Sequence, residues 1–150
     1  MKRFTRIMLA GAMLALVSGC ANTSLTSDID PSADIKSLQT FYVAKLPSDE
    51  RGIDVMIENE LNAIGKYATS GSDPKPSSPV DAVVTYEDKW MWDITMYMIE
   101  LEIDLRDPET NYEFATGRSY RTSLARKKPE EMVTEVLSKI FAGEISGEME

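Results

Sequence analysis

The stretch Thr95-Met-Tyr-Met-Ile-Glu-Leu-Glu-Ile-Asp-Leu105 decides the fold class. Apolar residues alternate along it with residues that are acidic or methionine. The first set is Tyr97, Ile99, Leu101, Ile103 and Leu105, and the second is Met96, Met98, Glu100, Glu102 and Asp104. A period of two over this length predicts an antiparallel strand with one face in the core and one in solvent. The segment from Asp107 to Asn111 then predicts a hairpin loop, and a return strand is expected over about Tyr112 to Thr122.

The chain before this strand predicts a strand, a helix and another strand. Ser37 to Leu46 contains three consecutive β-formers at positions 41–43. Ser48 is expected to cap a helix that ends near Gly65, because apolar residues follow at helical spacing: Ile53, Met56, Ile57, Leu61 and Ile64. The proline-rich residues 69–79 predict an exposed loop, and a strand is expected from Val80 to about Tyr86, with a turn or strand end at residues 87–89.

A last helix is expected from Pro129 to Gly143, since its apolar residues again share one stripe: Met132, Val133, Val136, Leu137 and Ile140. The order β-α-β-β-β-α predicts an α+β fold: a four-stranded mixed or antiparallel sheet with two helices on one face. We expect a single domain over residues 34–143 and an acidic tail over residues 144–150.

Residues 1–19 are typical of an export signal. Three basic residues precede an apolar run from Ile7 to Val17, which is shorter than the roughly 20 residues that span a bilayer. The run ends in Val17-Ser-Gly-Cys20, which resembles the lipobox of bacterial lipoproteins. The resemblance implies that Cys20 is acylated, for example with palmitate, and becomes the first residue. The alternative is an ordinary cleaved signal followed by a chance cysteine.

The residues that follow the lipobox indicate in which membrane the protein is anchored and how its domain is joined to the anchor. Ala21, where inner-membrane lipoproteins of enteric-type bacteria commonly have Asp, favours the inner leaflet of the outer membrane, with the domain in the periplasm. Residues 20–33 are mostly polar and are interpreted as a flexible tether.

Composition excludes several functions. The net charge is −9, and removing the signal takes away only positive charges, so bulk binding to nucleic acid is disfavoured. The chain has no histidine, which excludes histidine triads and histidine metal sites, and Cys20 is its single cysteine. No nucleophile motif is present, and we expect neither an enzyme nor a bound cofactor or metal.

Several segments resemble uncharacterised proteobacterial outer-membrane lipoproteins that carry a domain of unknown function. The similar stretches are Tyr86-Glu-Asp-Lys-Trp-Met-Trp-Asp93, Arg106-Asp-Pro-Glu-Thr110 and Gly117-Arg-Ser-Tyr120. Element order is distantly similar to that of accessory lipoproteins of envelope machines, an analogy of fold alone. The resemblance implies no catalytic residues.

Trp90 and Trp92, with Met96 and Met98 nearby, are the candidate residues for binding a partner. Two tryptophans two positions apart in a strand face the same way, and exposed tryptophans dock proteins or contact the membrane interface. The alternative is that they cover the open end of the core.

Charged and thioether residues offer weaker candidates. Glu100, Glu102 and Asp104 are interpreted as a solvated sheet face, because successive carboxylates on one face of a strand do not converge. The alternative is a binding surface, or a cation site shared with Asp107 and Glu109. Copper(I) binding by Met91, Met96 and Met98 has little support without histidine or cysteine. Five basic residues are interpreted as balancing the acidic strand across the hairpin, and the alternative is that they meet an acidic partner or an anionic glycan: Arg118, Arg121, Arg126, Lys127 and Lys128.

These observations predict a lipid-anchored, non-enzymatic periplasmic binding or assembly module of the cell envelope. It would contact the membrane through the lipid on Cys20 and an envelope protein through the sheet face or the Trp90 and Trp92 end. The alternative is a periplasmic carrier that holds a small hydrophobic ligand between the helices and the sheet.

Overall fold

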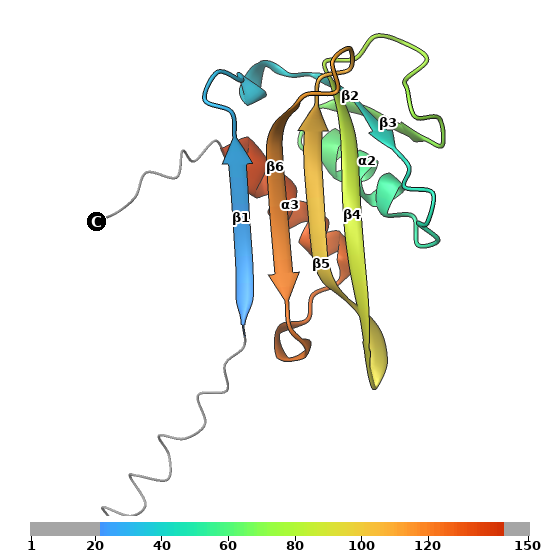
Figure 1. The fold of residues 1–150 in the computed structure, drawn as a ribbon, viewed down its shortest axis with the longest axis vertical. Helices are drawn as coiled ribbons and strands as arrows, with labels where there is room; N and C mark the ends of the chain where they lie inside the picture. Colours follow the sequence, from blue (N-terminus) through green and yellow to red (C-terminus); the bar gives the residue numbers. More distant parts are fainter. Residues whose placement is uncertain (1–21, 143–150) are drawn as a thin grey trace, which may run out of the picture.

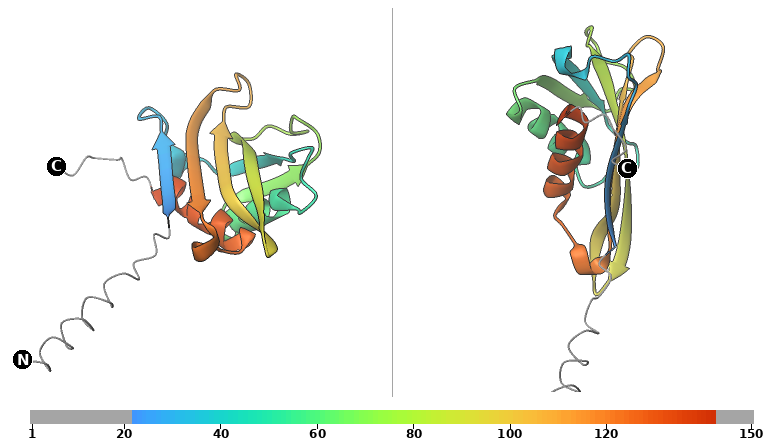
Figure 2. Two further views of the ribbon diagram at one scale, coloured as in Figure 1. Left: turned by 60° about the horizontal axis from the view of Figure 1, so that its bottom comes forward. Right: turned by 90° about the vertical axis from the view of Figure 1, so that its left-hand side faces the viewer.

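The computed structural model describes residues 22–142. They form a six-stranded sheet, in the order β1-β6-β5-β4-β2-β3, with helices α2 and α3 packed on one face (Figure 1, Figure 2). The strands are β1 (Thr23–Ile29), β2 (Thr40–Ala44), β3 (Tyr67–Gly71), β4 (Ala82–Asp93), β5 (Thr95–Arg106) and β6 (Glu113–Arg121). The helices are α2 (Ile53–Ala63) and α3 (Pro129–Ala142), with 3-10 turns η2 (Ile35–Ser37) and η3 (Ser123–Ala125).

The α+β class, the mixed sheet and the two helices on one face are confirmed, but the four-stranded sheet is wrong. β5 lies in the middle of an antiparallel β6-β5-β4 unit, as its alternating sequence predicted. β2 runs parallel to both β4 and β3. The two strands that the sequence did not reveal, β1 and β3, are the edges of the sheet.

The tether predicted over residues 20–33 is wrong for its central part. Thr23 to Ile29 form β1, which pairs antiparallel with β6 along its whole length, from Thr23 opposite Arg121 to Ile29 opposite Ala115. Most β1 side chains are exposed. An edge strand of this kind is held by backbone hydrogen bonds more than by burial, so its sequence lacks apolar alternation. The sheet therefore begins at Thr23 and not at residue 34.

Two boundaries in the next part of the chain also differ. β3 occupies the start of the predicted proline-rich loop, because parallel pairing with β2 satisfies its backbone. The turn expected at residues 87–89 is wrong, since β4 continues straight through it to Asp93 and pairs with β5 throughout. The charged side chains that suggested a turn belong to a solvent-facing strand.

A buried aspartate, and not Ser48, organises the start of α2. The Asp49 carboxylate accepts hydrogen bonds from the backbone N–H groups of Arg51 (2.7 Å) and Ile53 (2.7 Å), and from the Tyr86 hydroxyl (2.8 Å). Burial alone would raise the pKa of Asp49, but these hydrogen bonds outweigh it and hold the pKa below its ordinary value. Burial raises the pKa of Tyr86, so its hydroxyl stays a donor.

α3 lies across β1, β6 and β5, and its predicted apolar stripe is fully buried. Gly117 allows this contact: a Cβ atom there would lie 2.8 Å from Ile140 Cγ1 and 2.9 Å from Val136 Cγ1. The absence of a side chain at Gly117 therefore allows α3 to pack closely on β6.

Several predictions fall on residues outside the described range: the signal over 1–19, acylation of Cys20, the end of the last helix at Gly143 and the acidic tail. Between residues 22 and 142, no helix has the length and apolar character needed to span a bilayer.

Candidate functional site

The β4–β5 hairpin brings the four predicted contact residues onto one face. The register shifts between Lys89 and Trp90, so that Trp90 lies opposite Met98 and Trp92 opposite Met96. Residues directly opposite each other in an antiparallel pair point to the same side. Since Trp90 and Met98 both pack against the core, this face continues the helix-covered side of the sheet.

Burial divides these four residues into two pairs. Met98 is 1% exposed and belongs to the core, so its assignment as a contact residue is wrong. The β-bulge at Ile99 explains the error, because it reverses the alternation that placed Met98 on the solvent side. Trp92 and Met96 are 71% and 49% exposed and extend beyond the helices.

Trp90 is fixed at the boundary between the core and the exposed part of the hairpin. The Arg51 guanidinium lies over its ring, 4.0 Å from the centroid, and its indole N–H donates to the Asp88 carboxylate. Trp90 therefore covers the open end of the core, as in the alternative interpretation, whereas Trp92 does not.

The hairpin tip, which we define as residues 91–96, is an exposed apolar cluster. It holds four of the ten large apolar side chains exposed between residues 22 and 142: Met91, Trp92, Ile94 and Met96. Ile94 is the turn residue between Asp93 and Thr95, is 88% exposed, and has a φ of 63°. A β-branched residue rarely adopts this left-handed conformation. Ile94 was not among the predicted contact residues, although an isoleucine between two strands was a usable signal.

Arg126 holds the tip in place. Its guanidinium donates to Thr95 Oγ1 (2.7 Å) and to the Asp93 carbonyl (2.8 Å), and forms an ion pair with the Asp93 carboxylate (3.2 Å). It also stacks over the Tyr97 ring at 4.3 Å. The 3-10 turn η3, which directly precedes Arg126, carries the exposed Leu124. Asp93, the one charged residue of the tip, is thereby neutralised.

Within residues 22–142, no helix covers the other face of the sheet (Figure 2), and charged side chains lie on it, among them Lys89, Glu100 and Arg118. The buried Glu100 carboxylate accepts from Lys89 (2.6 Å) and from Arg118. Burial opposes ionisation, but these two cations hold the pKa of Glu100 below its ordinary value. Charge balance across the hairpin is confirmed for Arg118, whereas Arg121 and Lys127 pair instead with Glu135 of α3.

Glu102 lies on the same face opposite Arg118, but the Arg118 guanidinium binds Glu100 instead. Glu102 is also opposite Glu87 and next in line to Asp104, so burial and these neighbouring carboxylates raise its pKa. Asp104 is paired with Arg106 at 3.0 Å. Over residues 22–142, no group of three or more acidic side chains converges as a metal ligand set would.

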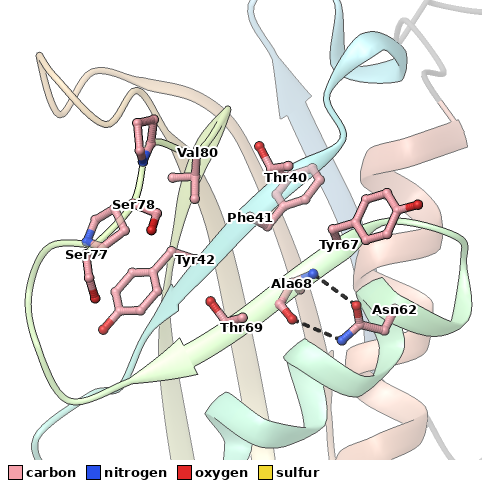
Figure 3. Close-up of a pocket in the computed structure, with 12 residues that line it drawn as sticks. Thr40, Phe41, Tyr42, Asn62, Tyr67, Ala68, Thr69, Ser77, Ser78 and Val80 are labelled. Atoms are coloured by element: carbon pink, nitrogen blue, oxygen red, sulfur yellow. Dashed lines mark hydrogen bonds between the residues drawn. The ribbon is translucent and has the colours of Figure 1, made fainter.

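A shallow hollow of about 500 Å³ lies between β2, β3 and the proline-rich loop (Figure 3). Its walls include Thr40, Tyr42, Thr69, Ser77 and Ser78. The Tyr42 hydroxyl donates to the Asp73 carbonyl at 2.8 Å, which ties the loop to the sheet. The hollow lies outside the helix–sheet interior where a hydrophobic ligand was expected.

The sequence matches no protein-family model and no curated protein. Among solved structures, the chain is similar to PelC from Paraburkholderia phytofirmans, a dodecamer, with a TM-score of 0.58 and 13% identity over 79% of this chain and 97% of that chain. A PDZ domain protein from Parabacteroides distasonis gives a TM-score of 0.50 and 12% identity, over 93% of this chain and 40% of that chain. At these identities the likeness establishes the fold alone, and the resemblance to an uncharacterised lipoprotein family stays a prediction.

Proposed function

We propose that this protein is a lipid-anchored, non-enzymatic periplasmic binding or assembly module of the cell envelope, held at the inner leaflet of the outer membrane. The observation that carries the proposal is the hairpin tip. Figure 1 shows that the β4–β5 hairpin extends to one end of the domain, and the apolar side chains of its tip, Met91, Trp92, Ile94 and Met96, are exposed. A projecting apolar cluster is suited to docking on another surface and not to enclosing a substrate.

The anchor part of the proposal rests on the signal and lipobox that end at Cys20. β1 begins only three residues after Cys20, and its first residue lies at the same end of the domain as the hairpin tip (Figure 1). An acyl group on Cys20 would therefore hold this end of the domain against the membrane.

The binding part of the proposal assigns the open sheet face to a protein partner. Its charged groups are held by one another, as in the Lys89–Glu100–Arg118 cluster, so a partner would meet charges that are already fixed in place. Support for assembly comes from PelC, which has this fold and forms a dodecamer.

The alternative, a carrier of a hydrophobic ligand, finds no support in the described residues. The space between the helices and the sheet is filled by core side chains such as Phe41, Ile57, Leu101 and Leu137, all almost completely buried. The hollow beside the proline-rich loop lies outside that interior and is open to solvent, so it does not enclose a hydrophobic ligand as a carrier would.

In-cell photo-crosslinking of the full-length protein, combined with palmitate labelling, tests the proposal. A photoreactive amino acid replaces Glu87 on the open sheet face or, as a control, the exposed Val55 on α2. We expect the wild type to incorporate palmitate, Cys20→Ser to lose the label, and position 87 to yield a discrete protein adduct that position 55 does not. An unlabelled wild-type protein, or identical patterns from both positions, would contradict the proposal.

A further inference from the structure

The hairpin tip combines features that a surface exposed only to water does not need. The segment from Trp90 to Met98 contains one charged residue, Asp93, and Arg126 neutralises it. Ile94 occupies the outermost position with a strained backbone that glycine or asparagine would adopt without cost. An isoleucine at such a position indicates that its apolar side chain is used.

The tip also has few open backbone groups. β4 and β5 remain paired up to Asp93 and Thr95, directly beside the turn. The Asp93 carbonyl accepts from Arg126. Unsatisfied backbone groups make entry into a bilayer costly, and the ladder up to the turn reduces that cost here.

The strand pairings show how far the hairpin tip and the proposed anchor at Cys20 each lie from Thr23. Thr23 lies opposite Arg121, next to the level of Glu100 and Lys89. Beyond Lys89, β4 continues to Asp93, so at about 3.3 Å per residue the tip stands about 10 Å past Thr23. Cys20 precedes Thr23 by three residues, so its Cα lies within about 11 Å of Thr23. Both can therefore reach the same plane.

We infer that the hairpin tip inserts into the headgroup region of the membrane and forms a second bilayer contact beside the acylated Cys20. The inference rests on the proposed lipid anchor. Tryptophan is enriched at this depth of a bilayer, and interfacial elements bury their apolar side chains about 5–10 Å deep. The acidic chain disfavours attraction to anionic lipids, so the contact is apolar and takes zwitterionic lipid.

Quenching by brominated lipids tests the inference on the purified, lipidated protein. The chain has two tryptophans, so Trp90→Phe leaves Trp92 as the reporter, and Trp92→Phe leaves Trp90 as the matched control. Each variant is reconstituted into phosphatidylcholine–phosphatidylethanolamine vesicles with or without bromine on the acyl chains. We expect Trp92 to lose most of its emission to bromine and Trp90 to keep most of it. Adding Ile94→Asn should restore part of the Trp92 emission. If Trp90→Phe fails to fold, the difference between wild type and Trp92→Phe reports Trp92.

The outcomes separate this inference from the proposed function. Failure of the wild type to float with vesicles would remove the anchor, and with it both proposals. A protein that floats, with Trp92 open to acrylamide and unaffected by bromine, would overturn only the insertion of the tip. Shielding of Trp92 from both quenchers would show that a protein surface covers the tip, which also overturns the inference.

Discussion

Replacing Ile94 by asparagine should make the folded protein more stable, although it removes an apolar side chain. Ile94 has a φ of 63° and is almost fully exposed. Asparagine tolerates this left-handed conformation, because its short polar side chain can hydrogen-bond locally, whereas the branched Cβ of isoleucine crowds the backbone.

The expected gain follows from two opposing terms. A left-handed conformation costs most residues roughly 1–2 kcal/mol, and I94N recovers most of this because the asparagine side chain is unbranched at Cβ and can hydrogen-bond locally. Full burial of an isoleucine contributes about 1.5–3 kcal/mol, but Ile94 is 88% exposed, so only a few tenths are lost. We expect the free energy of unfolding to rise by about 1 kcal/mol, which corresponds to roughly 3–5 °C in Tm.

Urea unfolding followed by far-ultraviolet circular dichroism measures this change in residues 20–150 carrying Cys20→Ser, away from any bilayer. The midpoint should rise while the m-value stays constant. Asn111 supplies a matched control, because it has a φ of 61° and is exposed in the loop between β5 and β6. N111I places isoleucine in the same conformation, so it should lower the free energy of unfolding by about 1 kcal/mol.

An unchanged or lower midpoint for I94N, together with destabilisation by N111I, would refute the reasoning. It would mean that Ile94 stabilises the folded protein in water, and the strained turn would no longer point to a role for its side chain at another surface.

Three further changes test the rest of the fold. Asp49→Ala removes a helix cap and leaves the Tyr86 hydroxyl without its acceptor, which should cost about 2 kcal/mol. Because the pKa of Asp49 is lowered in the folded state, the wild type should lose this contribution as the pH falls below the ordinary aspartate value, and a urea series at acidic pH in both proteins checks this. Gly117→Ala should cost about 2 kcal/mol in thermal unfolding, because the new methyl group meets Ile140. Glu102→Gln should raise the free energy of unfolding by about 0.5 kcal/mol at pH 7, because it removes a charge next to other carboxylates. In the wild type, Glu102 ionises in the unfolded chain before it does so in the folded protein, so stability should fall as the pH rises above 4.5, and the variant should lack this fall. Urea unfolding of both proteins at pH 4 and pH 7 measures the two effects.

The sequence was most informative where burial is strongest. The alternation over residues 95–105 predicted β5, and the stripe from Met132 to Ile140 predicted the buried face of α3. β1 and β3 were missed because edge strands are defined by their partners: seven largely polar residues at positions 23–29 become a strand through pairing with β6. The sequence of residues 23–29 alone therefore does not reveal their pairing with β6.

The candidate site was predicted in part for a similar reason. Trp92 and Met96 are exposed, as a docking role requires, but a single extra residue at Ile99 moved Met98 into the core. A bulge depends on how two strands meet, so alternation along one strand cannot reveal it. The roles of Ile94 and Arg126 depend on a turn geometry and a contact across 33 residues, respectively.

The pairing of β1 with β6 from Thr23 onward also limits how far this protein can search for a partner. However residues 20–22 are arranged, their covalent length keeps the first strand within about 11 Å of an acylated Cys20. A long linker between the lipid and the domain would let the domain reach proteins far from the membrane surface. Under the proposed acylation of Cys20, this short link would require any protein that meets the sheet to come to the surface of the bilayer itself.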